Sequence, residues 1–190
     1  MMLEKVESMK KSNRLVEILS NRKAKYIIGT ILLSGIGVAL PRIFHVLAGT
    51  SAGSTFLPMH IAVLIAALTF GITSATVVAG SSVIFSYLLT GMPSLARLPY
   101  MLIELVIYAI LLSLFNKKFN SYISLIATIV LGRIVYSGIL FAAIHVLGLP
   151  TYGISVIESI IAGIPGLIIQ LLFVPFIAKI MNERLKLKND

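Results

Sequence analysis

The chain has 190 residues, 58% of them hydrophobic, no cysteine and a formal net charge of +9. Its mean hydropathy of +1.01 exceeds what a soluble domain of this length can bury, because roughly half of such a domain must face water. The composition therefore excludes an ordinary soluble fold, and the lack of cysteine excludes disulfides, thiolate metal sites and thiol nucleophiles.

The apolar part of the chain begins at Tyr26 and continues to Ala178 with seven charged interruptions. A transmembrane helix needs about 20 apolar residues to cross a hydrocarbon core about 30 Å thick, so the interruptions divide this region into six spans. They are predicted at Tyr26–Leu47, at Phe56–Leu89 as two short spans joined by a turn at Gly71, and at Leu98–Phe115, Tyr122–Leu147 and Ser155–Ala178. We therefore expect an all-α integral membrane protein, a compact bundle of six transmembrane helices.

Two basic segments flank this region. Residues 1–25 are predicted as a basic cytoplasmic segment, residues 26–178 as the transmembrane substrate-binding domain and residues 179–190 as a basic cytoplasmic tail. The first segment is interpreted either as a helix on the inner leaflet, whose anionic lipids attract lysine and arginine, or as a partly ordered tail. Both alternatives keep it on the mature chain, since no small-residue cleavage site follows a short apolar region.

The distribution of lysine and arginine predicts the orientation. Basic residues precede the first span, follow the sixth, and occupy the connection between the fourth and fifth at Lys117 and Lys118. The opposite side carries only Arg42, near the end of the first span, and Arg97, before the fourth. The positive-inside rule then places both termini in the cytoplasm. The net charge is thus a topology signal and does not indicate nucleic-acid binding.

Under this topology, the polar groups within the spans lie mostly in the outer half of the membrane. A charged side chain there is costly unless it faces protein, water or a partner, so each one is a candidate functional residue. We predict a polar chamber that opens outward and binds a small solute. Its candidate binding residues are Arg42, His60, Arg97, Glu104, Tyr108, Arg133, Tyr136, Glu158 and Gln170.

Some of these residues have a structural alternative. Arg133 either contributes to binding or forms an ion pair with Glu104 or Glu158 that joins two helices. His60 either donates to a solute or caps the start of the second span beside Pro58. The residues predicted to lie at the membrane interface are His45, His145, Tyr100 and Tyr152.

Two further features concern motion and packing. The uncharged connection at residues 48–55 is predicted to act as a lid over the chamber. Small residues four apart let helices approach closely, either within the bundle or at an interface with another membrane protein. The pairs are Gly35 and Ala39, Ala75 and Ala79, and Ala162 and Gly166.

The sequence carries no motif for catalysis. It has no P-loop and no Gly-x-Ser-x-Gly nucleophile turn, and its three histidines lie on three different spans, which disfavours a metal site. We expect no enzymatic activity, no cofactor and no metal. Uphill transport would then draw its energy from an ion gradient or from partner subunits.

Five short motifs together resemble a known family. They are Leu57-Pro58-Met59-His60-Ile61, Thr90-Gly91-Met92-Pro93, Glu104-Leu105 with Tyr108, Leu131-Gly132-Arg133-Ile134-Val135 and Ile164-Pro165-Gly166-Leu167-Ile168-Ile169-Gln170. On these motifs the region from Tyr26 to Ala178 resembles the substrate-binding S component of energy-coupling factor (ECF) transporters, a vitamin-uptake family. Members often dock the coupling protein through an Ala-x-x-x-Ala pattern in the first helix, whose nearest match here is Gly35 with Ala39.

The resemblance implies a protein of the bacterial plasma membrane that captures a vitamin or vitamin precursor from outside. Its implied partners are a transmembrane coupling protein and two cytoplasmic ATPase subunits, and it would topple in the membrane to release its cargo. The solute is left open, because the arginines suit an anion such as pantothenate, while the carboxylates and tyrosines suit a pyridoxine-like, pyrimidine or benzimidazole compound. The alternatives are a stand-alone secondary transporter or small channel, and a structural or assembly subunit.

Overall fold

The computed structural model describes residues 21–49, 56–95, 97–145 and 156–186, and these contain six α-helices and no strand. The helices are α2 (Arg22–Ala48), α4 (Pro58–Thr69), α5 (Ile72–Thr90), α6 (Leu98–Phe115), α7 (Ser121–His145) and α8 (Val156–Leu185). Five of them, all except α4, are long and apolar enough to span a membrane. The predicted all-α fold is confirmed for this part of the chain. Residues 1–20, Tyr152 and residues 50–55 of the predicted lid lie outside it.

The first and last helices extend beyond the predicted spans into the basic flanks. α2 begins at Arg22, because the side chain of Asn21 accepts a hydrogen bond from the backbone N–H of Lys23 at 3.0 Å and so caps the helix. α8 continues to Leu185 through lysine, methionine, glutamate and arginine, which all favour helices. The predicted boundaries after residues 25 and 178 therefore lie inside these two helices.

The apolar stretch between residues 56 and 89 is divided into two helices, as the sequence predicts. α4 ends at Thr69 and α5 begins at Ile72, with Gly71 between them at φ 82°, a conformation that glycine adopts without steric cost. α4 has 12 residues, which extend about 18 Å against a hydrocarbon core of about 30 Å. In contrast to the predicted span, α4 is thus too short to cross a membrane alone.

Pro58 sets the start of α4. Proline suits the first turn of a helix, because its φ is already helical and it lacks the N–H that would be unpaired there. Leu57 before it has φ 47° and ψ 47°, so the helix does not continue in the amino-terminal direction. The space beyond the first turn of α4 is therefore not filled by this helix.

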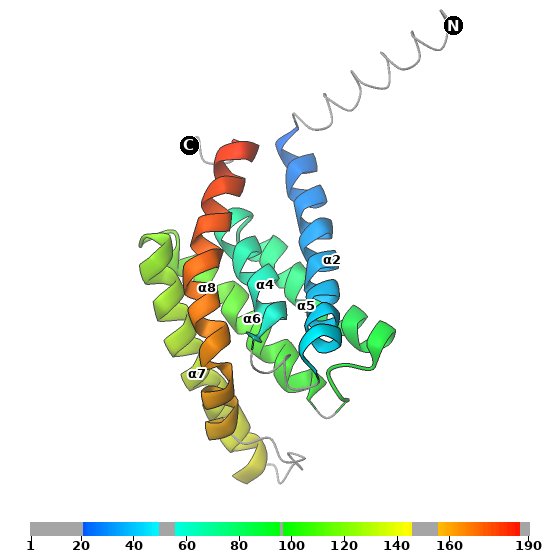
Figure 1. Cartoon of the computed structure of the whole chain (residues 1–190). Helices are drawn as coiled ribbons and strands as arrows, with labels where there is room; N and C mark the ends of the chain where they lie inside the picture. The colour runs from blue at the N-terminus through cyan, green and yellow to red at the C-terminus, as the bar shows by residue number, and fades with distance from the viewer. Residues whose placement is uncertain (1–20, 50–55, 96, 146–155, 187–190) are drawn as a thin grey trace, which may run out of the picture.

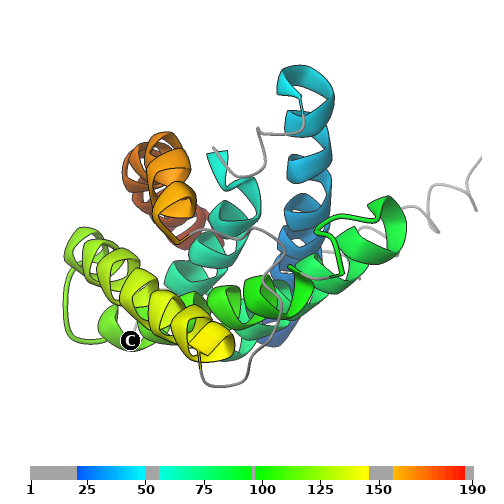
Figure 2. The same cartoon turned by 90° about the horizontal axis from the view of Figure 1, so that it is seen from below.

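α4 forms the centre of the bundle. It packs against α2, α5, α6 and α8, and α7 packs against α6 and α8. Figure 2 shows α2 and α8 on opposite sides of α4, in agreement with Figure 1. Eleven of its 12 residues are buried, whereas the surrounding helices expose large apolar side chains such as Ile31 and Ile134. Apolar exposure on this scale is typical of a surface that faces lipid.

Two glycines determine how closely α2 packs. A Cβ atom at Gly29 would collide with the ring of Phe70, and a Cβ atom at Gly37 would collide with the hydroxyl of Ser82. Both glycines are buried. The backbone of α2 therefore approaches α5 and the end of α4 at positions where only glycine fits.

The predicted small-residue pairs have different environments. Gly35 and Ala39 lie on the exposed side of α2, where a Cβ atom at Gly35 would meet nothing within 4 Å. In the part of the bundle that the structure describes, this pair therefore does not contribute to internal packing, and the alternative of an interface with another membrane protein remains. Ala75 and Ala79 on α5 are fully buried, as internal packing requires. In the third pair Gly166 is buried, and the side chain of Ala162 lies outside the described residues.

The described ends of the chain lie at one end of the bundle (Figure 1). The ammonium group of Lys25 donates a hydrogen bond to the carbonyl oxygen of Leu185 at 2.9 Å, which joins the start of α2 to the end of α8. The connection between α6 and α7 lies toward this end too. We call it the basic end, because its described basic residues, which are Arg22, Lys23, Lys25, Lys117, Lys118, Lys179, Arg184 and Lys186, outnumber its one acidic residue, Glu183.

Candidate functional site

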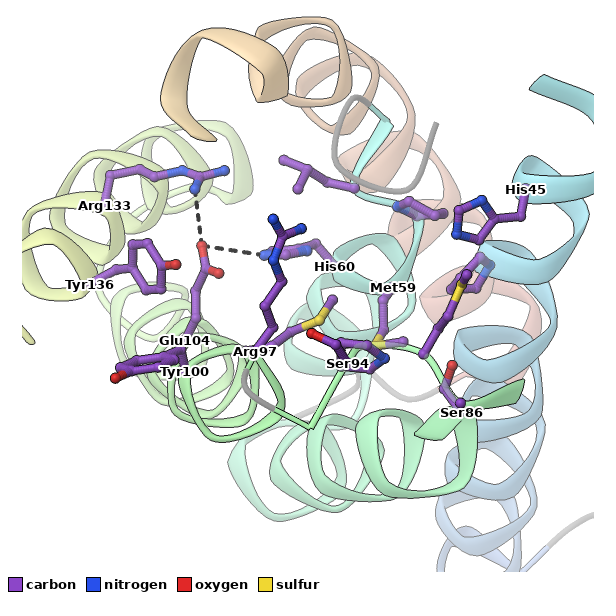
Figure 3. Close-up of a pocket in the computed structure, with 17 residues that line it drawn as sticks. His45, Met59, His60, Ser86, Ser94, Arg97, Tyr100, Glu104, Arg133 and Tyr136 are labelled. Atoms are coloured by element: carbon purple, nitrogen blue, oxygen red, sulfur yellow. Dashed lines mark ion pairs between the residues drawn. The ribbon is translucent and has the colours of Figure 1, made fainter. Parts of the chain in front are cut away.

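A cavity of about 430 Å³ lies at the end of the bundle opposite the basic end. Its wall is built from α2, α4, α5, α6 and α7 and from the connection between α5 and α6 (Figure 3). The cavity occupies the space beyond the first turn of α4, and Leu57, Pro58 and Met59 form part of its wall. Its volume is within the range of pockets for small organic molecules, about 300 to 1,000 Å³.

Three ionisable side chains from three helices meet at the floor of the cavity. Nη1 of Arg133 on α7 lies 3.1 Å from Oε1 of Glu104 on α6, and Nε2 of His60 on α4 lies 3.5 Å from the same oxygen. The side chains of His60, Glu104 and Arg133 are 2%, 9% and 11% exposed. A buried carboxylate needs a cationic partner, because an isolated charge is very costly to remove from water. These residues, the Glu104 cluster, therefore connect α4, α6 and α7.

Helical spacing explains the contribution of α6. Arg97, Tyr100, Glu104 and Tyr108 are three or four residues apart, so they lie on one face of the helix. The first three line the cavity, and Tyr108 lies one turn further toward the basic end. Ile103, on another face of the helix, is exposed. One face of α6 thus supplies both the cavity wall and the side chain beneath it.

Tyr108 supports His60 from the side of the basic end. Its ring is fully buried and meets the imidazole edge-on, with ring centroids 5.3 Å apart and an interplanar angle of 87°, a geometry that aromatic pairs prefer. Gly132 of α7 makes room for the ring, since a Cβ atom there would lie 3.0 Å from two of its carbons. Tyr108 therefore positions His60 and does not itself line the cavity.

Arg133 is held between α6 and α8. Its Nη1 faces Glu104, while a Cβ atom at Gly163 of α8 would come within 3.2 Å of its Nη2. Nε and Nη2 are buried and have no hydrogen-bond partner in the described part of the chain. The predicted ion pair with Glu104 is present, and both of its members line the cavity. The side chain of Glu158, the other predicted partner, lies outside the described residues.

The structure brings most of the predicted site residues together. Those that line the cavity are His60, Arg97, Glu104, Arg133 and Tyr136. Arg42 lines a smaller neighbouring cavity of about 250 Å³ between α2 and α5. Tyr108 and Gln170 are fully buried and outside both linings, and the side-chain amide of Gln170 has no partner among the residues described.

Other wall residues are absent from the predicted set. Tyr100 and His45, which the sequence assigns to the membrane interface, line the cavity. The spacing of Tyr100 from Arg97 and Glu104 is a signal that could have identified it. The further wall residues include Pro41, Met59, Ser86, Met92, Ser94 and Met101. Met59 and Met92 lie within the motifs, whereas the others carry no local signal.

The cavity offers groups suited to binding a small molecule. A carboxylate oxygen of Glu104 can accept a hydrogen bond, the guanidinium of Arg97 can bind an anion, and Tyr100 and Tyr136 can donate from a hydroxyl or pack against a ring. The methionines add adaptable apolar contact. Comparisons of this chain with protein-family models, with curated proteins and with solved structures found no match, so the interpretation of the site rests on its geometry.

Proposed function

We propose that this chain is the membrane-embedded substrate-binding subunit of an ECF-type importer in a bacterial plasma membrane. It captures a vitamin or vitamin precursor from outside and delivers it with a transmembrane coupling protein and two cytoplasmic ATPase subunits. The observation that carries the proposal is the cavity of about 430 Å³ with the Glu104 cluster at its floor. His60, Glu104 and Arg133 belong to the motifs that resemble S components, and all three line this cavity.

The proposed orientation follows from the charge at the two ends of the bundle. The basic end faces the cytoplasm by the positive-inside rule, so both termini lie inside and the cavity opens outward. α4 then covers the inner part of the hydrocarbon core with its length of about 18 Å, and the cavity occupies the outer part. The short helix thus makes a binding site within the membrane thickness.

The burial of α4 favours a binding subunit over a channel. Eleven of its 12 residues are buried, and they fill the centre of the bundle between the cavity and the basic end. A molecule in the cavity would have to displace this helix, or the whole protein would have to move, before release on the other side. Partner subunits that hydrolyse ATP would supply the energy for such a movement.

The test separates capture from transport. The full chain is purified alone in lipid nanodiscs, and the small molecules that it retains are identified by mass spectrometry. It is then reconstituted in liposomes with and without the coupling protein and ATPase subunits of the same organism. We expect the isolated chain to bind its substrate, and uptake to require both the partners and ATP.

Three other results would each support a different function. Uptake by the chain alone that follows an ion gradient would identify a secondary transporter. Passive flux down the gradient of the solute would identify a channel. If the chain retains no small molecule and no uptake occurs in the presence of the partners, the result would identify a structural subunit.

A further inference from the structure

Among the residues that the structure describes, the cavity wall holds more positive than negative charge. The charged residues of this part of the wall are Arg97, Glu104 and Arg133, and Arg133 forms the ion pair with Glu104 at 3.1 Å. Arg97 is exposed, and among the residues that the structure describes its guanidinium forms no ion pair. Figure 3 shows its side chain extending over the cavity. One positive charge of the wall is therefore available to a bound molecule.

A second positive contribution comes from the start of α4. Met59 and His60 in its first turn line the cavity, and this turn contains no acidic residue. The amino-terminal end of a helix carries a partial positive charge and backbone N–H groups without helical partners. The field of α4 therefore adds to that of Arg97.

Glu104 provides a hydrogen-bond acceptor elsewhere in the wall. Its Oε1 lies 3.1 Å from Nη1 of Arg133 and 3.5 Å from Nε2 of His60, and Glu104 is one of the residues that line the cavity. A carboxylate oxygen accepts hydrogen bonds from hydroxyl or N–H groups and repels an anion. Arg97 and Glu104 are seven residues apart on one face of α6, which separates them by about 10 Å along the helix axis.

We propose that the substrate is a small organic monoanion whose carboxylate binds Arg97 and whose hydroxyl or amide N–H group, toward the other end, binds the carboxylate of Glu104. A guanidinium binds a carboxylate through two parallel hydrogen bonds, and Tyr100 and Tyr136 pack against the apolar body of the molecule. A cationic substrate is disfavoured, because Arg97 and the start of α4 repel it. This inference rests on the proposed function. Of the two solute classes that the sequence leaves open, it selects an organic acid over a nitrogen heterocycle.

The experiment uses the full chain in nanodiscs in three forms. They are the unchanged protein, Arg97→Gln, and Lys117→Gln as a charge-matched control at the basic end, where Lys117 is exposed. Retained molecules are identified by mass spectrometry in both ion polarities, and the affinity of each one and of its primary amide is measured by calorimetry. The thermal unfolding midpoint of each variant shows that it is folded.

We expect the retained molecule to be an acid whose amide binds about tenfold more weakly to the unchanged protein. Arg97→Gln should lower the affinity for the acid by a similar factor and leave the affinity for the amide nearly unchanged. Lys117→Gln should change neither.

Two kinds of result would overturn the inference. A retained molecule that is neutral or cationic, or an acid that binds Arg97→Gln as tightly as the unchanged protein, would overturn the substrate class while the binding function stands. Retention of no molecule by any form, with no uptake in the presence of partners, would overturn the proposed function and this inference with it.

Discussion

Nη1 of Arg133 lies 3.1 Å from Oε1 of Glu104, and this pair joins α7 to α6 at the floor of the cavity. His60 reaches the same oxygen from α4 at 3.5 Å, so one carboxylate oxygen connects three helices. The cluster therefore contributes both to the packing of the bundle and to the charge of the cavity. These two roles can be separated by experiment.

Removal of one member of the pair should destabilise the protein more than removal of both. Glu104→Gln and Arg133→Gln each leave a buried charge without its partner, at a cost of about 3 to 5 kcal/mol. The double variant leaves neither charge, so we expect it to recover most of the lost stability while substrate binding stays lost. Thermal unfolding in detergent and calorimetric binding check the two parts. A double variant as unstable as the sum of the single variants would show that the ion pair is not the source of the stability.

Gly132→Ala should disturb the support of His60. The added Cβ atom would lie 3.0 Å from ring carbons of Tyr108, which is fully buried and cannot move outward freely. Overpacking of this kind costs about 1 to 3 kcal/mol, and displacement of Tyr108 should also weaken binding. Gly138→Ala on the same helix is the matched control, since its Cβ atom would meet nothing within 4 Å. Equal unfolding midpoints for the two variants would contradict the close contact of Gly132 with Tyr108.

Gly37→Ala should loosen the contact of α2 with α5, whereas Gly35→Ala should not. A Cβ atom at Gly37 would collide with the hydroxyl of Ser82, while the same atom at Gly35 would meet open space. Close backbone approach at small residues is a main source of helix association in lipid. We expect a lower unfolding midpoint for Gly37→Ala alone. The reverse ranking would mean that Gly35, and not Gly37, faces the bundle.

The orientation can be measured with single cysteines, because the chain has none of its own. Lys117→Cys places a thiol at the basic end, and Ser94→Cys places one in the cavity wall at the opposite end, both at exposed positions. We expect a membrane-impermeant maleimide to label Ser94→Cys in intact cells and Lys117→Cys only after permeabilisation. The opposite pattern would invert the topology.

The all-helical fold of the described residues could be predicted from local sequence, although α4 is shorter than the predicted span. α6 has the predicted bounds Leu98–Phe115, and the break between α4 and α5 is at Gly71 as predicted. Both depend on neighbouring residues only, since a long apolar segment requires a helix and a glycine with positive φ ends one. Five residues of the predicted site line the cavity, and four of them could be identified for a similar reason, because polar groups within apolar spans are rare. The fifth, Arg97, directly precedes the span Leu98–Phe115.

The faces of the helices depended on the packing of segments far apart in the chain. Tyr100 lines the cavity instead of the membrane interface, Tyr108 and Gln170 lie outside its lining, and Gly37 instead of Gly35 faces α5. A helix that is apolar on all sides carries no hydrophobic face to indicate which side points inward, and lipid favours no side over another. Close fit between helices, together with the need of Glu104 for Arg133, sets these orientations.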